Sequence, residues 1–226
     1  MRGADIPSAP IAWLPTLLAK GPVPLQREHL RRHPHTARAM RLHCIVLDTS
    51  GSMQRQGRLA RAKGQVAALL EQAARQRDDV AVLCFGGQGV ELLMPPGPAR
   101  SSARQRLRPL GGGGGTPLAR ALSEADRLLQ AASRTPASSR AALGKGSGAG
   151  RARAIEGWLW LLSDGRTLEQ PRPPRAARHV VIVDFDDPLK PAGRCAAWAE
   201  AWGARYLRPE YGANAAQPVT PAHLLN

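Results

Sequence analysis

The sequence is poor in cysteine, and this shortage narrows what the chain can be. Among its 226 residues there are three cysteines, Cys44, Cys84 and Cys195, which lie far apart and outside C-x-x-C spacing. This number and spacing argue against a disulfide framework and against a cysteine-based zinc site. Because two of the three lie inside apolar runs, we expect buried thiols in a reducing compartment.

Long hydrophobic runs are also missing. No apolar run approaches the roughly 18 residues needed to cross a bilayer, and prolines interrupt the N-terminal segment where a signal peptide would need its apolar core. We therefore expect a soluble, cytoplasmic protein without a membrane partner. Aromatic residues are few, with five Trp, two Tyr and two Phe. The apolar residues are mainly Ala, Leu and Val, which favours helices layered on a sheet.

Acidic residues are scarce beside basic ones. The chain has 17 Asp and Glu against 32 Lys and Arg, a formal net charge of +15, and only four of the basic residues are lysines. Such a balance raises non-specific affinity for polyanions, although a GC-rich coding sequence would enrich the same residues. The arginines are spread over the chain, and no basic and aromatic platform for bases is evident. We therefore expect an acidic protein partner and no nucleic acid.

Composition divides the chain into an arm, one large domain and a tail. Residues 1–40 hold six prolines and scattered basic residues, which indicates a loosely ordered arm with a short helix near Trp13 to Ala19. Residues 41–211 are expected to form the domain, and residues 212–226 a C-terminal tail. Within the domain, residues 133–154 contain five basic residues and no acid, which is typical of a flexible insertion.

The domain alternates buried strands with amphipathic helices. Continuous apolar runs predict strands at 42–48, 80–85, 90–94, 158–163 and 179–184, with a short last strand near Tyr206. Three- and four-residue apolar spacing predicts helices at 59–73, 117–132 and 194–202. The glycine-rich residues 86–89 predict a hairpin between two strands. The expected fold class is α/β, with a doubly wound, mostly parallel central sheet and helices on both faces.

Three polar segments follow strands or return to the same edge of this predicted sheet. They are Asp48-Thr49-Ser50-Gly51-Ser52, Thr116 after a glycine run, and Ser163-Asp164-Gly165. In doubly wound sheets, ligands bind at the carboxyl ends of the strands. The segments offer carboxylates and hydroxyls without His or Cys, and hard oxygen donors of this kind favour Mg²⁺ or Mn²⁺ over zinc or copper.

The five residues 48–52, D-T-S-G-S, together with the distant Thr116 and Asp164, resemble the metal-ion-dependent adhesion site of von Willebrand factor A domains. The resemblance implies that the hydroxyls of Ser50, Ser52 and Thr116 coordinate the metal. It implies that the carboxylates of Asp48 and Asp164 act directly or through water. A carboxylate of a partner protein would complete the coordination shell.

Four further segments resemble the C-terminal part of the magnesium chelatase D subunit and its cobalt chelatase counterpart. They are residues 62–64, 85–96, 114–119 and 162–166, and the resemblance covers roughly residues 30–211. It implies a non-catalytic accessory subunit that docks an AAA+ ATPase subunit, for insertion of Mg²⁺ or Co²⁺ into a tetrapyrrole held by a separate large subunit. Family D subunits carry an AAA+-like domain and an acidic linker ahead of this module. Neither precedes it here, so a free-standing version is expected.

Other functions would account for some of the same sequence features. An A-domain adaptor of a non-chelatase AAA+ ATPase would have the same fold, and an RNA-binding A-domain protein would use the positive charge. Residues 144–148 lack the spacing of a phosphate loop, so we expect no nucleotide site. His33 and His35 are interpreted as solvated rather than metal-binding. Trp158 and Trp160 are interpreted as core residues rather than a tetrapyrrole contact, and we expect no catalytic residue.

Overall fold

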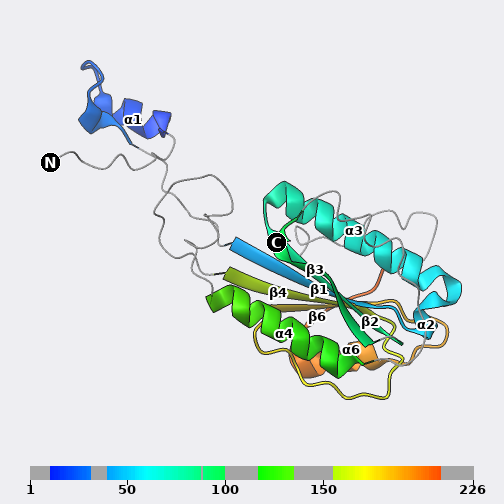
Figure 1. Ribbon diagram of the computed structural model, residues 1–226. Coiled ribbons are helices and arrows are strands. Elements are labelled where there is room, and N and C mark those ends of the chain that lie inside the picture. The colour runs from blue at the N-terminus through cyan, green and yellow to red at the C-terminus, as the bar shows by residue number, and fades with distance from the viewer. Residues whose placement is uncertain (1–10, 32–39, 88, 100–116, 135–154, 210–226) are drawn as a thin grey trace. The chain divides into compact units, whose positions relative to one another are not determined.

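The computed structural model describes residues 11–31, 40–87, 89–99, 117–134 and 155–209 (Figure 1). The chain divides into two compact units, one of residues 1–39 and 136–153 and one of residues 40–135 and 154–226. The predicted limits of arm, domain and tail stay predictions. Within the described part, no helix combines the length and the apolar character needed to cross a bilayer.

The described part of the first unit is a short helix followed by a returning segment. Helix α1 spans Trp13–Lys20, one residue beyond its predicted end, and the 3-10 helix η1 spans Arg27–His29. The Thr16 hydroxyl donates to the Arg31 carbonyl at 3.1 Å and accepts from the Arg31 N–H at 2.8 Å. The N–H of Ala12 donates to the same carbonyl at 2.8 Å. These bonds hold the two ends of the segment together.

The second unit is built on a six-stranded sheet of order β3-β2-β1-β4-β5-β6. The strands are β1 Met40–Asp48, β2 Asp79–Gly86, β3 Gly89–Pro98, β4 Ile155–Ser163, β5 His179–Asp184 and β6 Arg205–Leu207. All neighbouring strands are parallel except β2 and β3, which form an antiparallel hairpin with Gly86 opposite Gly89. The predicted fold class and the predicted hairpin are confirmed.

Helices cover both faces of this sheet (Figure 1). They are α2 Gly51–Gln54, the 3-10 helix η2 Arg55–Gly57, α3 Arg58–Gln76, α4 Leu118–Arg134 and α6 Arg194–Trp202. Helix α3 buries its apolar side against one face, and α4 and α6 bury theirs against the other. Since α4 continues through Arg134, the predicted insertion loses Ser133 and Arg134 to this helix; its other residues, 135–153, lie outside the described residues, as does Ala154.

Strands β1 and β4 begin two or three residues before their predicted apolar runs. β1 begins at Met40 and β4 at Ile155, and their first residues include the charged Arg41 and Glu156, which lie opposite each other in the ladder. The Arg41 Nε donates to a Glu156 carboxylate oxygen at 3.0 Å. Cross-strand pairing of opposite charges extends the sheet beyond its apolar part.

A chain of polar contacts runs through the core beside β1. The Trp160 indole N–H donates to His43 Nδ1 at 3.2 Å, and His43 Nε2 lies 3.3 Å from an Asp78 carboxylate oxygen. Because an indole can only donate, Nδ1 is the acceptor and the imidazole proton lies on Nε2, facing Asp78. Trp158 and Trp160 are both buried, with ring centroids 6.1 Å apart, so they pack in the core as interpreted from the sequence.

The three cysteines are free and buried. Burial raises the pKa of the Cys44 and Cys84 thiols to about 12 and raises that of Cys195 well above its ordinary value. Because the thiolate is the reactive form, we expect no reaction of the folded protein with a chromogenic disulfide reagent at mildly alkaline pH. All three thiols should react after unfolding in guanidinium. Rapid labelling of one thiol in the folded protein would contradict this burial.

Candidate metal centre

The carboxyl ends of β1, β4 and β5 bring three polar loops to one edge of the sheet. The chain leaves β1 toward β2 on one side, and β4 lies on the other side of β1. Connections that diverge from neighbouring strands leave a crevice at their carboxyl ends, which is where doubly wound sheets bind ligands. The loops begin at Asp48, Ser163 and Asp184, the last residues of the three strands.

Asp48 lies at the end of β1, and its side chain is fully buried. One carboxylate oxygen accepts the Ser50 N–H at 2.8 Å, and the other accepts the Ser163 hydroxyl at 2.5 Å. Burial raises the pKa of Asp48 to about 6, although the hydrogen bonds from Ser163 and Ser50 favour its ionised form. The ionised Asp48 carboxylate accepts these hydrogen bonds from neutral groups only. A cation bound beside it would therefore stabilise its negative charge.

Ser50 and Ser52 present their hydroxyls side by side, with the two oxygen atoms 3.1 Å apart. Their loop is anchored by Thr49, whose N–H and hydroxyl both donate to the Phe85 carbonyl, at 2.8 and 3.0 Å. The approach requires a glycine at position 86, because a Cβ there would lie 2.6 Å from the Thr49 hydroxyl oxygen. The end of β2 therefore positions the loop that carries both serines.

Asp164 is buried, and each of its carboxylate oxygens has a donor. One accepts the Arg166 N–H at 3.1 Å, and the other lies 3.3 Å from Arg58 Nη1. Arg58 is itself only 4% exposed, and its Nη2 lies 3.7 Å from an Asp187 carboxylate oxygen. Its Nη1 also lies 3.5 Å from the Ser52 carbonyl oxygen. Arg58 thus links the three loops and supplies a fixed positive charge beside Asp164.

Sequence reasoning missed Arg58. It is the first residue of α3, where the helix dipole disfavours a cation, and the first turn of α3 has no acidic residue. A cation at an unfavourable end of a helix is a weak signal that a carboxylate elsewhere compensates it. The partner could not be read from the sequence, since Asp164 is 106 residues away.

A second arginine ties the loop after β4 to the loop after β5. Arg166 Nε donates to an Asp186 carboxylate oxygen at 2.9 Å, and its Nη2 donates to the Lys190 carbonyl at 2.7 Å. The other Asp186 oxygen accepts the Ala192 N–H. Asp184 accepts the Asp186 N–H at 2.8 Å and the Tyr206 hydroxyl at 2.6 Å. The acidic run that follows β5 is therefore occupied by internal hydrogen bonds.

The structure brings Asp48, Ser50, Ser52 and Asp164 to the same edge of the sheet, while Thr116 lies outside the described residues. Among the residues described, no three His, Cys, Asp or Glu side chains gather as a metal site. The donor set at this edge consists of hydroxyl and carboxylate oxygens instead. Hard oxygen donors with few carboxylates fit Mg²⁺, which keeps several waters and takes only one or two protein carboxylates.

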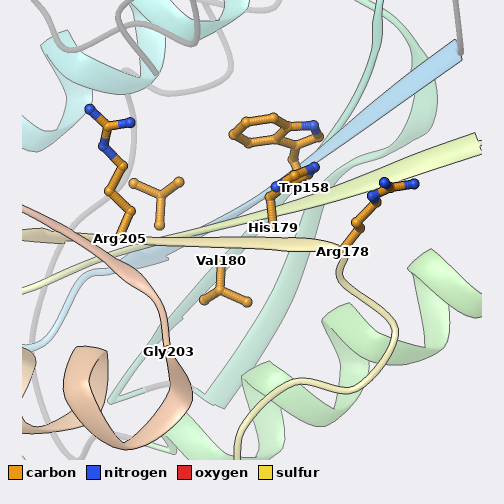
Figure 2. Close-up of a pocket in the computed structure, with 7 residues that line it drawn as sticks. Trp158, Arg178, His179, Val180, Gly203 and Arg205 are labelled. Carbon is orange, nitrogen blue, oxygen red and sulfur yellow. The ribbon is translucent and has the colours of Figure 1, made fainter. Parts of the chain in front are cut away.

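A separate cavity lies at the opposite edge, near the amino ends of β4, β5 and β6 (Figure 2). Its volume is about 220 Å³, and it is lined by Trp158, Arg178, His179, Val180, Val181, Gly203 and Arg205. The His179 ring stacks on Trp158 at 4.2 Å and contacts a Glu156 carboxylate oxygen at 2.8 Å. Burial opposes ionisation of Glu156, but the hydrogen bonds from His179 and Arg41 outweigh it and lower the pKa. Its lining does not include Asp48, Ser50, Ser52 or Asp164.

Comparison with known proteins identifies relatives of the chain. The sequence profile of the von Willebrand factor type A domain matches residues 44–143. The chain is 36% identical over 194 residues to the magnesium-chelatase 60 kDa subunit of Cereibacter sphaeroides, covering 82% of this chain and 31% of that protein. It is 33% identical over 137 residues to the magnesium-chelatase 67 kDa subunit of Chlorobaculum tepidum, covering 52% and 22%. The chain thus spans less than a third of the length of these curated relatives.

Solved structures share the fold. A mutant of the PilB minor pilin from Streptococcus sanguinis superposes with a TM-score of 0.56 at 12% identity, covering 79% of this chain and 59% of the pilin chain. At that identity the likeness concerns the fold alone. The profile match and the chelatase relatives confirm the resemblance predicted from the sequence motifs. Residues 44–143 match the von Willebrand factor type A domain, and over 82% of its length the chain is homologous to the magnesium-chelatase 60 kDa subunit.

Proposed function

We propose that this chain is an accessory subunit of a metal chelatase that holds Mg²⁺, or Mn²⁺, and uses it to dock an AAA+ ATPase subunit. The ligands would be Asp48, Ser50, Ser52, Thr116 and Asp164. One observation supports this most directly: two buried carboxylates and two adjacent hydroxyls lie at one sheet edge in a homologue of magnesium-chelatase subunits.

The candidate ligands would have two different roles at this site. Asp48 and Asp164 supply the negative charge, and the neutral hydroxyls of Ser50 and Ser52 supply further oxygen ligands. When bound, Mg²⁺ would supply a Lewis-acidic contact for a carboxylate of the partner. The hydrogen bonds to Asp48 and Asp164 fix their carboxylates before binding, which lowers the ordering cost of docking.

If the chain is an accessory subunit, other subunits carry out ATP hydrolysis and metal insertion. The AAA+ subunit would hydrolyse ATP, and a separate large subunit would hold the tetrapyrrole into which Mg²⁺ or Co²⁺ is inserted. In this scheme the chain contributes neither a nucleophile nor a nucleotide site. Its arginine-rich surface would favour an acidic face on the ATPase and speed their encounter at low salt.

The test is binding to the AAA+ chelatase subunit encoded in the same genome. We expect biosensor binding in Mg²⁺ or Mn²⁺, and none after chelation with EDTA. Thr116→Ala removes a neutral ligand and should weaken the metal-dependent binding about tenfold, the effect of losing one hydrogen-bond-sized interaction. Ser133→Ala, at the exposed end of α4, is the matched control and should bind like the wild type. Full-strength binding in EDTA would overturn the proposal.

A further inference from the structure

Two large apolar side chains are exposed on the loops that flank the candidate metal centre. Leu168 is 90% exposed and Leu189 is 88% exposed. Among the described residues of the second unit, the next most exposed large apolar side chain is Leu92, at 41%. Leu168 lies in the loop after β4, which begins with the candidate ligand Asp164. Leu189 lies in the loop after β5, whose last residue, Asp184, is paired with Ser163 in the sheet.

The exposure of these leucines does not come from loosely held loops. On one side, the Leu189 N–H donates to an Asp187 carboxylate oxygen at 3.0 Å. On the other side, a Glu169 carboxylate oxygen accepts the Ala119 N–H at 2.7 Å, which ties the residue after Leu168 to the start of α4. Hydrogen bonds therefore hold the Leu189 backbone and the residue after Leu168, so little ordering would be needed when the two leucines are covered.

The two leucines also lie around a common point. The 2.7 Å hydrogen bond from Arg166 to the Lys190 carbonyl joins the two loops. Leu168 is two residues from one end of this bond, and Leu189 is next to the other. Arg166 in turn donates its N–H to Asp164, so the bond that joins the leucine loops starts from the candidate ligand loop.

The exposed charges of this rim are positive, while Glu169 and Asp187 on the same loops are half-buried. Arg55, Arg166 and Lys190 are exposed, whereas the carboxylates of Asp48, Asp164 and Asp186 are buried behind them. Arg55 belongs to the same rim because its neighbour Gln56 donates to Asp187 at 3.5 Å. A surface with exposed cations and exposed leucines is complementary to a segment that is both acidic and apolar.

We propose that Leu168 and Leu189, with Arg55 and Lys190, form a docking rim that selects a partner segment in which an acidic side chain is flanked by large apolar ones. This inference rests on the proposed function, since the acidic side chain is the one that would reach the metal. The metal contact gives attraction to carboxylates in general. The rim adds the discrimination, because apolar anchors covered at the centre of an interface carry much of its binding energy.

The test uses Leu168→Gln, Leu189→Gln and the double variant, with Leu92→Gln as the control on β3. Affinity for the AAA+ chelatase subunit is measured in Mg²⁺, and Mg²⁺ affinity is measured separately by calorimetry. We expect each single variant to weaken partner binding about tenfold and the double variant about 50-fold or more, as interface anchors do. Mg²⁺ affinity should stay unchanged in all of them, and Leu92→Gln should behave like the wild type.

Four results would contradict the proposed docking rim. A double variant that binds the ATPase as tightly as the wild type, while binding still requires Mg²⁺, would leave the proposed function standing and remove the rim. Loss of Mg²⁺ affinity in the leucine variants would make the leucines part of the metal site. Self-association that only the double variant abolishes, with unchanged ATPase binding, would make the occupant a second copy of this chain. If the wild type itself fails to bind the ATPase in Mg²⁺, the proposed function fails and the rim with it.

Discussion

Asp48→Asn should leave the domain folded while lowering its Mg²⁺ affinity by at least about 100-fold. Asparagine keeps an acceptor for the Ser50 N–H, and the Ser163 hydroxyl can rotate to accept from the new amide. What disappears is the negative charge. Two unit charges 4 Å apart near a protein surface interact by about 4 kcal/mol, so losing one carboxylate beside a divalent ion costs at least two orders of magnitude in affinity.

In the absence of metal, Asp48→Asn should stabilise the folded domain or leave its stability unchanged. Burial raises the pKa of Asp48 to about 6, so the folded protein binds this proton more tightly than the unfolded chain does. Ionisation of Asp48 therefore costs stability as pH rises from the ordinary aspartate pKa through about 6. A neutral asparagine avoids that cost, and the melting temperature in EDTA should equal or exceed that of the wild type at neutral pH.

Asp48→Ala is the matched comparison. It removes the same charge but leaves the Ser50 N–H and the Ser163 hydroxyl without their acceptor, which costs about 1–3 kcal/mol for a buried group. Calorimetric titration with Mg²⁺ and melting curves in EDTA separate the two effects. Both variants should lose the metal, and only the alanine should melt earlier. An asparagine variant that keeps wild-type Mg²⁺ affinity would remove Asp48 from the ligand set.

Arg58→Ala should be the most destabilising single change around the site when metal is absent. It leaves the buried Asp164 carboxylate without its ion pair and takes one cation away from Asp187. Removing one partner of a buried pair typically costs about 3–5 kcal/mol, because the remaining charge is uncompensated. Arg75→Ala is the control, because Arg75 is exposed near the other end of α3.

Mg²⁺ should restore part of the stability that Arg58→Ala loses. With Arg58 gone, the bound ion would be the main positive charge beside Asp164, so the gain in stability on adding Mg²⁺ should exceed the gain of the wild type. Urea unfolding in EDTA and in saturating Mg²⁺ measures both quantities. A loss below about 1 kcal/mol in EDTA, typical of exposed ion pairs, would show that Asp164 does not depend on Arg58.

The sequence predicted those parts of the fold that depend on local pattern. The central strands are continuous apolar runs, and their cores were placed correctly. Their first residues were missed because Arg41 and Glu156 are polar and pair only once β1 and β4 are side by side. β3 runs to Pro98 through several prolines, which local rules assign to a strand end, whereas an edge strand tolerates them.

In the candidate site, too, the sequence predicted the residues that depend on local pattern and missed those that depend on tertiary contacts. The residues 48–52 and 163–165 could be placed at one sheet edge because each follows a buried strand. Arg58 could not be assigned, because its role depends on a carboxylate far away in the sequence. The exposure of Leu168 and Leu189 was equally out of reach, since a leucine in a loop is covered or uncovered only by the tertiary arrangement.

The polar chain of Trp160, His43 and Asp78 has a consequence for which strand alignments are possible. The central parts of β1 and β4 are mostly apolar, so a shift by one residue would still bury apolar side chains on both faces. Such a slip turns the shifted strand's side chains to the opposite face. It would part His43 from Trp160 and leave buried donors and acceptors unpaired, at about 1–3 kcal/mol each. The alignment that avoids this penalty is the one in which Ser163 meets Asp48, so a contact deep in the sheet selects the pairing that assembles the loops at its far edge.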